Sequence, residues 1–322
     1  FRSFEKYHGG APSIDQLVVR VIEDDNTRLL ALLGKSVELA QNTVSPMMLP
    51  VVNDARGLEV ETDKSFKYSY LGFNLEHEIL EHRPVRRAIA YGIDRREIID
   101  HKFRGHARLA TGMLAPGHWA YEPDVQKYPY RPEQARELLD EAGFERPKPG
   151  EPRFSLNFKV SSGQFQKSIA QLMAHQLGRI GIDVTVRAYE RGTFFHDIKS
   201  RNFAMTTMQW PSVIEPNLYK WIFHSDNIPT AENRSAGANR GAYRNSKVDR
   251  LLMKGQEVTD RESRKQIYGQ IQKILARDLP YVSLWHEDNI AVMREGVRDY
   301  HMTPNGRLEY LKQTRFEPAE ER

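Results

Sequence analysis

The chain has 322 residues, of which 39% are hydrophobic and 28% are charged. Lys and Arg number 47 and Asp and Glu 43, and the resulting charge of +4 is spread along the sequence rather than gathered in a basic run. These values are typical of a folded protein of about two domains and do not favour nucleic-acid binding. The absence of cysteine excludes disulfides, thiolate catalysis and cysteine zinc sites, but leaves the cellular compartment open. No apolar run approaches the ~18 residues that cross a bilayer.

The first part of the sequence predicts short strands that alternate with helical turns. Apolar alternation predicts strands at 17–22, 58–61 and 66–73, and a helix at 27–33 ends at Gly34. From residue 83 onward helical patterns dominate. Pro84 suits the first turn of one helix, Asp94 can cap a second, and Pro132 opens a third.

A β-α-β unit follows a connector rich in proline and charge at residues 145–152. Residues 154–160 alternate as a strand, apolar positions from Ile169 to Ile180 form a helical stripe, and residues 182–188 alternate again. Such a unit pairs parallel strands through a right-handed crossover. The remaining sequence predicts a strand at 202–210, a polar loop at 227–245, helices at 247–258 and 261–279, and strands at 281–285 and 289–293.

Residues 83–144 carry a longer and more specific pattern. Val85-Arg86, Ala90-Tyr91, Ile93-Asp94-Arg95, Trp119 and Ala142-Gly143-Phe144 are among its matching positions. The segment resembles the one that opens the second lobe of family 5 extracellular solute-binding proteins, the dipeptide, oligopeptide and nickel receptors of ABC importers. Stretches at 7–15, 34–40, 70–74 and 278–285 are similar to the same family.

The resemblance implies an α/β fold of the type II periplasmic-binding-protein kind, with two lobes joined by hinge strands. Residues 1–76 with 287–322 would form part of the first lobe, and residues 77–286 would form the second. The hinge crossings would lie near Asn74 and Trp285. A further N-terminal segment of the same protein would precede Phe1, so that strands 17–22 and 68–73 would have open edges or apolar faces.

The same resemblance implies a binding protein rather than an enzyme. We expect no cofactor and, from the spacing of the histidines, no bound metal. It would hold a peptide or a similar small solute between its lobes and deliver this ligand to an ABC permease in the membrane. It would be periplasmic or extracellular, and associated with the membrane through its transporter.

Three strand ends supply candidate ligand-binding residues, because ligands of open α/β sheets lie beyond the carboxyl ends of the strands. An ordinary capped turn after the first strand and a core role for the tryptophan are the alternatives. The candidates are Ser161, Ser162, Gly163 and Gln164 after the first strand, Tyr189 and Glu190 after the second, and Trp210, Pro211, Ser212 and Val213 after the third.

Peptide receptors of the family carry Arg-x-Gly-Trp-x-x-Asp at this third strand end, and the Asp holds the amino terminus of the ligand. Trp210 matches the motif, but Thr207, Gln209 and Val213 occupy its Arg, Gly and Asp positions. Both charges are missing, so the resemblance does not extend to this way of anchoring a peptide.

Two other classes of protein remain as alternatives. One is the ligand-sensing domain of a transcriptional regulator that resembles these receptors. The other is a zinc hydrolase, which the stretch from His77 to His82 suggests. Zinc proteases of the His-Glu-x-x-His type place the two histidines four positions apart on a helix, whereas position 81 is a glutamate here. The spacing therefore disfavours a zinc site.

Overall fold

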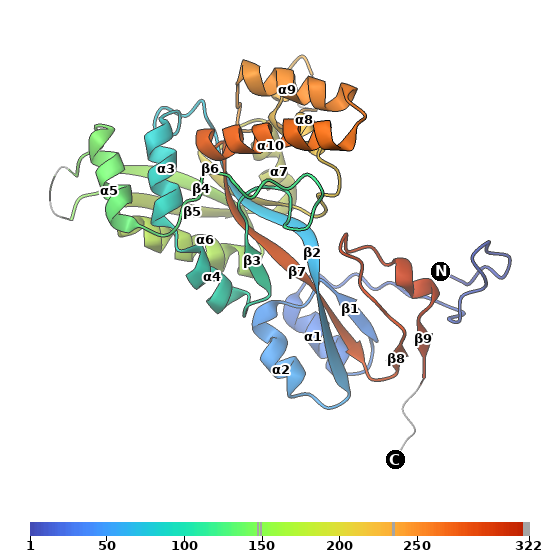
Figure 1. Cartoon of the computed structure of the whole chain (residues 1–322). Helices are drawn as coiled ribbons and strands as arrows, with labels where there is room; N and C mark the ends of the chain where they lie inside the picture. The colour runs from blue at the N-terminus through green and yellow to red at the C-terminus, as the bar shows by residue number, and fades with distance from the viewer. Residues whose placement is uncertain (147, 149, 234–235, 318–322) are drawn as a thin grey trace.

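Two long strands, β2 (Leu58–Phe73) and β7 (Tyr281–Arg294), pair antiparallel along most of the molecule (Figure 1). They are the centre of a seven-stranded sheet in the order β1-β7-β2-β6-β4-β5, with β3 also paired to β7. The computed structural model describes residues 1–146, 148, 150–233 and 236–317. The other strands are β1 (Leu39–Gln41), β3 (Ala107–Leu109), β4 (Phe154–Ser161), β5 (Ile182–Tyr189), β6 (Met205–Trp210), and the separate pair β8 (Val297–Arg298) and β9 (Arg315–Phe316).

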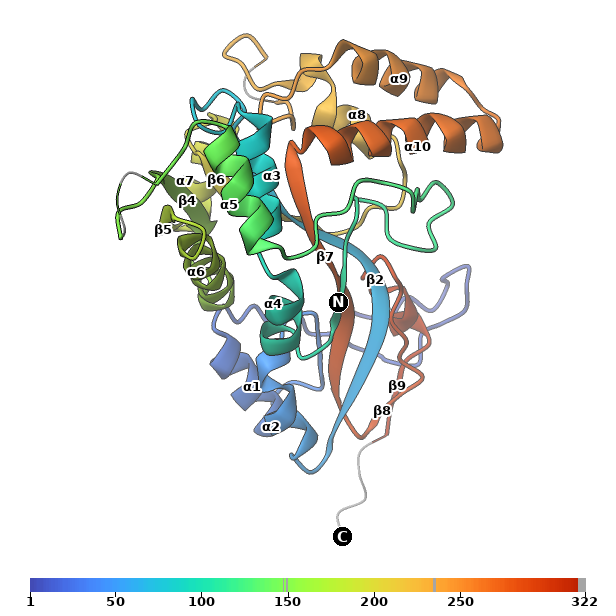
Figure 2. The same cartoon turned by 60° about the vertical axis from the view of Figure 1, so that its left-hand side comes forward.

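Helices cover both faces of the sheet at its upper end, and the lower end carries two more (Figures 1 and 2). The predicted helices at 83–92, 94–105, 132–142, 164–180, 247–258 and 261–279 all form, with small differences at their ends. The helices are α1 (Asp25–Leu33), α2 (Leu49–Asn53), α3 (Arg83–Gly92), α4 (Arg95–Lys102), α5 (Pro132–Glu141), α6 (Gln164–Gly178), α7 (Arg191–Lys199), α8 (Leu218–Phe223), α9 (Ser246–Glu257) and α10 (Arg261–Asp278).

The upper part of the molecule, residues 68–286, has two apolar cores on opposite faces of the sheet. One core packs α3, α4, α5 and α6 against β4 and β6. The other packs α8, α9 and α10 against the tyrosine-rich face of β2. The lower part, residues 23–64 with 288–317, has its own smaller core between α1, α2 and the far ends of β2 and β7. Separate cores at the two ends of one pair of strands give the α/β fold in two parts that the sequence predicts.

Strands β2 and β7 are each continuous, whereas the sequence pattern predicts two strands in place of each. The register of their pairing shifts between Lys64 and Lys67 and again between Ser69 and Tyr70. Three of the four residues in the first irregular stretch, Lys64, Ser65 and Lys67, are polar, and this is where the strand leaves one core and has not yet reached the other. Apolar alternation therefore stops while the backbone pairing continues.

The packing places the boundary between the two parts earlier in the chain than the position expected between residues 76 and 77. Residues 68–73 pair with β6 and pack in the upper cores, so they belong with the upper part. Asn74 donates its backbone N–H to the carbonyl of Ala204, and Trp285 packs on Phe103 with ring centroids 5.0 Å apart. Both expected hinge residues lie inside the upper part rather than between the two parts.

The expected strand at 17–22 does not form. The backbone bridge between Arg2 and Gln16 is the contact of strand type in residues 1–22, and a strand needs a partner to satisfy its backbone. Val18, Val19 and Val21 are 65%, 63% and 90% exposed. The apolar side chains that were expected to be exposed are therefore exposed, although this segment is irregular and not a strand.

The expectation of an open edge at residues 68–73 was also wrong, because β6 and β7 pair with this stretch on both sides. The open edge lies lower on the same strand. Residues 58–64 pair with β7 on one side, and within the part of the chain that the structure describes no strand pairs with their other side.

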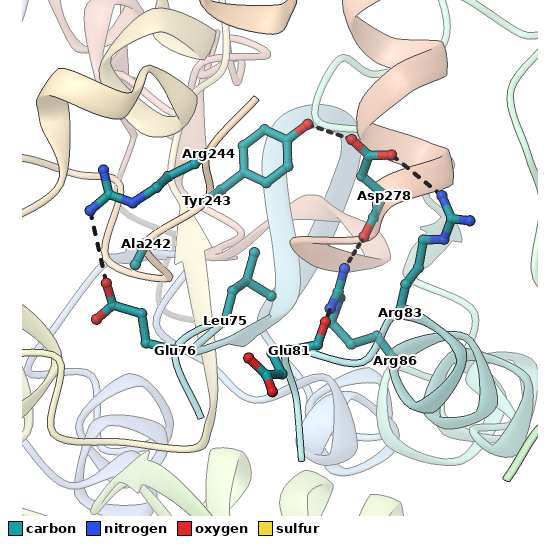
Figure 3. Close-up of a pocket in the computed structure, with 9 residues that line it drawn as sticks. All are labelled: Leu75, Glu76, Glu81, Arg83, Arg86, Ala242, Tyr243, Arg244 and Asp278. Atoms are coloured by element: carbon teal, nitrogen blue, oxygen red, sulfur yellow. Dashed lines mark hydrogen bonds and ion pairs between the residues drawn. The ribbon is translucent and has the colours of Figure 1, made fainter. Parts of the chain in front are cut away.

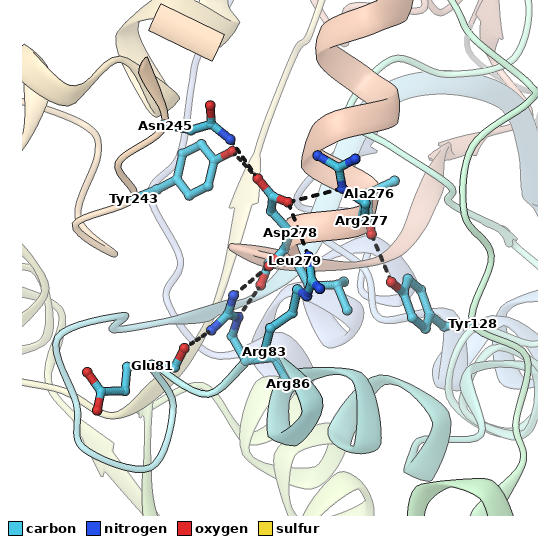
Figure 4. Close-up of polar contacts among 10 residues, drawn as sticks. All are labelled: Glu81, Arg83, Arg86, Tyr128, Tyr243, Asn245, Ala276, Arg277, Asp278 and Leu279. Atoms are coloured by element: carbon cyan, nitrogen blue, oxygen red, sulfur yellow. Dashed lines mark hydrogen bonds and ion pairs between the residues drawn. The ribbon is translucent and has the colours of Figure 1, made fainter. Parts of the chain in front are cut away.

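A buried arginine joins α3 to the end of α10 (Figure 4). Arg86 is 6% exposed, and its guanidinium donates to the carbonyls of Leu80, Glu81, Asp278 and Leu279 at 2.6–3.0 Å. Burial lowers its pKa to about 10, so the group keeps its charge at neutral pH. It thereby satisfies carbonyls that the last turn of α10 leaves without helical partners.

The side chain of Asp278 completes this junction. Its carboxylate accepts hydrogen bonds from the Tyr243 hydroxyl at 2.7 Å and from the Asn245 amide at 2.9 Å. Arg83, by contrast, is half exposed and lies 3.9 Å from the same carboxylate. Arg86 and Arg83 therefore contribute differently to stability, since Arg86 is buried and makes four hydrogen bonds whereas Arg83 is half exposed.

We expect Arg86→Met to destabilise the protein by about 3 kcal/mol or more, because it leaves buried carbonyls without donors. Arg83→Ala is the matched control one helical turn away, and it should cost less than about 1 kcal/mol because exposed ion pairs contribute little. Urea unfolding followed by circular dichroism measures both. Equal losses for the two variants would show that burial of Arg86 is not what matters.

Candidate ligand-binding site

The carboxyl ends of β4, β5 and β6 meet at one edge of the sheet. β4 is parallel to β5, with Ser161 opposite Tyr189, and parallel to β6. β6 is antiparallel to β2, so its last residue, Trp210, lies opposite Tyr68. Tyr68 stands just above the irregular stretch where β2 and β7 continue into the lower part. The three predicted loops therefore lie at the edge from which the sheet crosses to the lower part.

The loop after β4 is open at this edge. Ser162, Gly163 and Gln164 are exposed, and Gly163 stands at the N-cap of α6 without a side-chain cap. Phe165, in the first turn of α6, packs edge-to-face on Phe103. A serine therefore does not cap α6, contrary to the alternative considered above. The first backbone N–H groups of this helix receive no side-chain cap.

The two residues at the end of β5, Tyr189 and Glu190, make their contacts with neighbouring parts of the same region. The carboxylate of Glu190 accepts the backbone N–H groups of Gly192 and Thr193 and caps α7, a helix that the sequence pattern does not predict. Tyr189 lies under the ammonium of Lys159, which is 5.2 Å from its ring centre and is paired with Asp197 at 2.7 Å. Glu190 is therefore poorly placed to supply a free charge to a ligand.

The stretch after β6 divides into accessible and buried residues. Trp210 is partly exposed and packs edge-to-face on Trp221, with ring centroids 5.5 Å apart. Pro211 is exposed and Ser212 partly so. Val213 is 1% exposed and belongs to the core on the α8 side, so its expected place in the lining of the site was wrong.

Ser69 and Glu287, which the sequence analysis did not select, complete this edge together with the expected hinge residue Trp285 and with Gln209. Ser69 donates its hydroxyl to the carboxylate of Glu287 at 2.8 Å, and the indole N–H of Trp285 reaches the same oxygen at 3.3 Å. The Gln209 amide donates to the Ser69 hydroxyl at 3.4 Å. These residues lie inside strands and 218 positions separate Ser69 from Glu287, so no local pattern marks them.

A cavity of about 340 Å³ lies just past the carboxyl end of β2, at the other end of the upper sheet, and contains none of the predicted site residues (Figure 3). Its charged walls are largely paired with one another: Arg244 lies 3.9 Å from Glu76, and Asp278 accepts the bonds described above. Its lining residues are Leu75, Glu76, Glu81, Arg83, Arg86, Ala242, Tyr243, Arg244 and Asp278. Apart from the carboxylate of Glu81, the charged groups at this end of the sheet mainly join secondary-structure elements to one another.

The histidines that suggested zinc do not converge. His77 accepts the backbone N–H of Ile79, and His82 is exposed beside Glu81. Across residues 1–146, 148, 150–233 and 236–317, no three His, Cys, Asp or Glu side chains gather as a metal site would require. Of the helices in the same residues, none has both the length and the apolar character that crossing a membrane requires.

Residues 1–229 match the model of the middle part of the bacterial extracellular solute-binding proteins, family 5 ("family 5 Middle"). The match covers more than half of the chain. The chain belongs to this family. Its members are binding proteins found outside the cytoplasm, in agreement with the class of protein that the sequence predicted.

Known members of family 5 resemble the chain along almost all of its length. The probable di/tripeptide-binding protein 5 of Pseudomonas aeruginosa is 30% identical over 95% of this chain and 57% of its own length. The structure of the oligopeptide-binding protein AppA from Bacillus subtilis with a nonapeptide matches 98% of this chain and 63% of that one, at 25% identity and a TM-score of 0.86. NikZ from Campylobacter jejuni with Ni(L-His) has the same fold, with a TM-score of 0.86 at 22% identity over 98% of this chain and 64% of that one. The chain thus spans a little more than half of the length of such relatives.

The burial of Val213 leads to a direct test. Val213→Asp would place a carboxylate in an apolar core, and we expect it to cost about 3 kcal/mol or more of stability. Ile214→Asp is the matched control, because the neighbouring Ile214 is 45% exposed and should tolerate the charge with little loss. Thermal and urea unfolding of both variants provide the comparison, and an equally mild effect of both would place Val213 at the surface.

Proposed function

We propose that the chain is the larger part of the substrate-binding component of a bacterial ABC importer. It binds a peptide or a similar small solute between two lobes and delivers it to the permease in the membrane. The observation that carries this proposal is the meeting of the β4, β5 and β6 ends at the edge where β2 and β7 cross to the lower part. A ligand at that edge contacts both parts at once, so binding can draw them together.

The proposed ligand class rests on the relatives and on the chemistry of this edge. The P. aeruginosa and B. subtilis relatives are named for di-, tri- and oligopeptides. Peptide backbones need hydrogen-bond donors and acceptors as well as flat apolar contacts. The exposed polar groups of Ser162 and Gln209 supply the first, and the partly exposed indole of Trp210 supplies the second.

We further propose that the lower part is completed by another segment of the same protein. The unpaired side of residues 58–64 supports this, since an exposed strand edge is a template for an added strand. Exposed apolar side chains near the start of the chain support it as well, and these are Phe1, Phe4, Val18, Val19 and Val21. The completed part would be the first lobe of the receptor.

The hinge of such a receptor would lie lower than the sequence suggested. We place it at residues 64–67 of β2 and the facing residues 287–288 of β7, where the pairing register is irregular. An irregularity in the ladder leaves the backbone freer to twist than regular pairing does. Closure of the two lobes would then bend the strands between the two sets of cores and leave each core intact.

The proposal is tested by calorimetric titration of the full-length receptor with trialanine. Burial of one aromatic face against a ligand contributes roughly 1–2 kcal/mol, so Trp210→Ala should weaken binding about tenfold. Trp119→Ala is the control, because the Trp119 ring lies against Arg261 and Arg264 of α10 instead. Unchanged affinity in Trp210→Ala would remove this strand end from the site, and no heat from any di- or tripeptide would remove short peptides from the ligand class.

A further inference from the structure

We infer that Glu287 is the anion that holds a positively charged group of the ligand, the free amino terminus in the case of a peptide. This inference rests on the proposed function and names a specificity-determining residue for it. The acid expected at position 213 from the family motif is a buried valine in this chain. A peptide held at this edge by its amino terminus therefore needs a carboxylate from elsewhere.

The other acidic side chains of this edge are already engaged. Glu190 caps α7. Glu215 pairs with Arg264 at 2.6 Å, and Asp197 pairs with Lys159 at 2.7 Å. Asp288, next to Glu287 on β7, pairs with Arg108 at 3.2 Å. Each of these carboxylates would have to give up a partner before it could bind a ligand cation.

Glu287 is held in place but is not neutralised. One carboxylate oxygen accepts from the Ser69 hydroxyl and the Trp285 indole N–H, both of which are neutral donors. The Ser65 hydroxyl donates to the Glu287 backbone carbonyl at 2.5 Å and fixes the strand. Within the described residues, no cationic group lies within 4.0 Å of the carboxylate, and its second oxygen accepts no hydrogen bond. The carboxylate is thus held in one orientation before a ligand binds, and its second oxygen can accept further hydrogen bonds.

The neighbouring strand contributes a charge of opposite sign. Lys67 faces Glu287 in the register, and burial lowers the pKa of its ammonium while Glu287 and Asp288 act to raise it. His286 is buried, and the resulting desolvation lowers its pKa to about 4, so it is neutral at pH 7. Glu287 therefore has Lys67 and the Asp288–Arg108 pair as its charged surroundings, and it lacks a direct counter-ion.

The location of Glu287 connects it to the open strand ends. Trp285, which donates to Glu287, packs on Phe103, and Phe103 packs on Phe165 in the first turn of α6. The exposed Gln209 amide reaches the Ser69 hydroxyl that holds Glu287. Glu287 also lies on β7 at the crossing to the lower part. Lobe closure there would remove water from the carboxylate. The free-energy cost of this desolvation is offset when the ligand places an ammonium group beside the carboxylate.

The test compares trialanine with N-acetyltrialanine on the full-length receptor, using isothermal titration calorimetry at pH 7. Wild-type protein should bind the free amine about tenfold to a hundredfold more tightly, as a charge-assisted pair of ~1.5–3 kcal/mol requires. Glu287→Gln keeps the shape of the side chain, and it should abolish most of this preference while changing the affinity for the acetylated peptide little. Glu215→Gln is the control and should keep the full preference.

Ser69→Ala provides a second route if Glu287→Gln does not fold. It keeps the charge but removes a group that orients it, so the preference for the free amine should fall by a smaller factor. An undiminished preference in folded Glu287→Gln, or equal weakening for both peptides, would overturn the assignment of Glu287 and leave the proposed function intact. Absence of binding by either peptide to wild-type protein would overturn both.

Discussion

The antiparallel pairing of β2 with β7 is the constraint on which the rest of this structure depends. The ladder runs from Leu58 opposite Arg294 to Gly72 opposite Tyr281, and it passes through two sets of cores. Because β6 pairs with the upper half of β2, the direction of β6 is fixed, and the parallel strands β4 and β5 follow it. The three strand ends are thereby brought to the one edge of the upper part that adjoins the lower part.

The two ends of the upper sheet have different chemistry as a consequence. At the far end, Arg86 and Asp278 use most of their hydrogen-bonding capacity to join α3, α10 and the segment before α9. At the near end, Gln209 and Glu287 retain free donors or acceptors, and the loop before α6 is exposed. Groups that are satisfied within the protein stabilise it, whereas groups with spare capacity can recognise a ligand. This contrast favours the near end over the cavity at the far end as the place where a ligand binds.

Periodicity in the sequence predicted much of the upper part, because local pattern and tertiary environment agree there. The alternation of Phe154 to Val160 and the stripe of α6 correspond to a strand and a helix that are buried on one side. The prediction failed where contacts between distant parts of the chain determine the local structure. Residues 17–22 have the apolar content of a strand but no partner, and the polar residues at 62–65 interrupt a pattern without interrupting β2.

Some residues of the candidate site could likewise be located from the sequence, and others could not. Loops after strands can be located from the pattern, and residues 161–164, 189–190 and 210–212 do lie at one edge. The burial of Val213 follows from packing against α8 and could not be seen in a motif comparison that treats position 213 as a ligand contact. Glu287 and Ser69 meet through strand register across 218 positions, which a single sequence does not specify.

Hydrogen–deuterium exchange of the full-length receptor, with and without saturating trialanine, shows which end of the upper sheet binds the ligand. We expect slower exchange on ligand binding in peptides that cover residues 161–165, 208–213 and 285–288, and unchanged exchange around residues 75–86 and 242–244 at the far cavity. Slower exchange at the far cavity, with none at the ends of β4 and β6, would contradict this expectation.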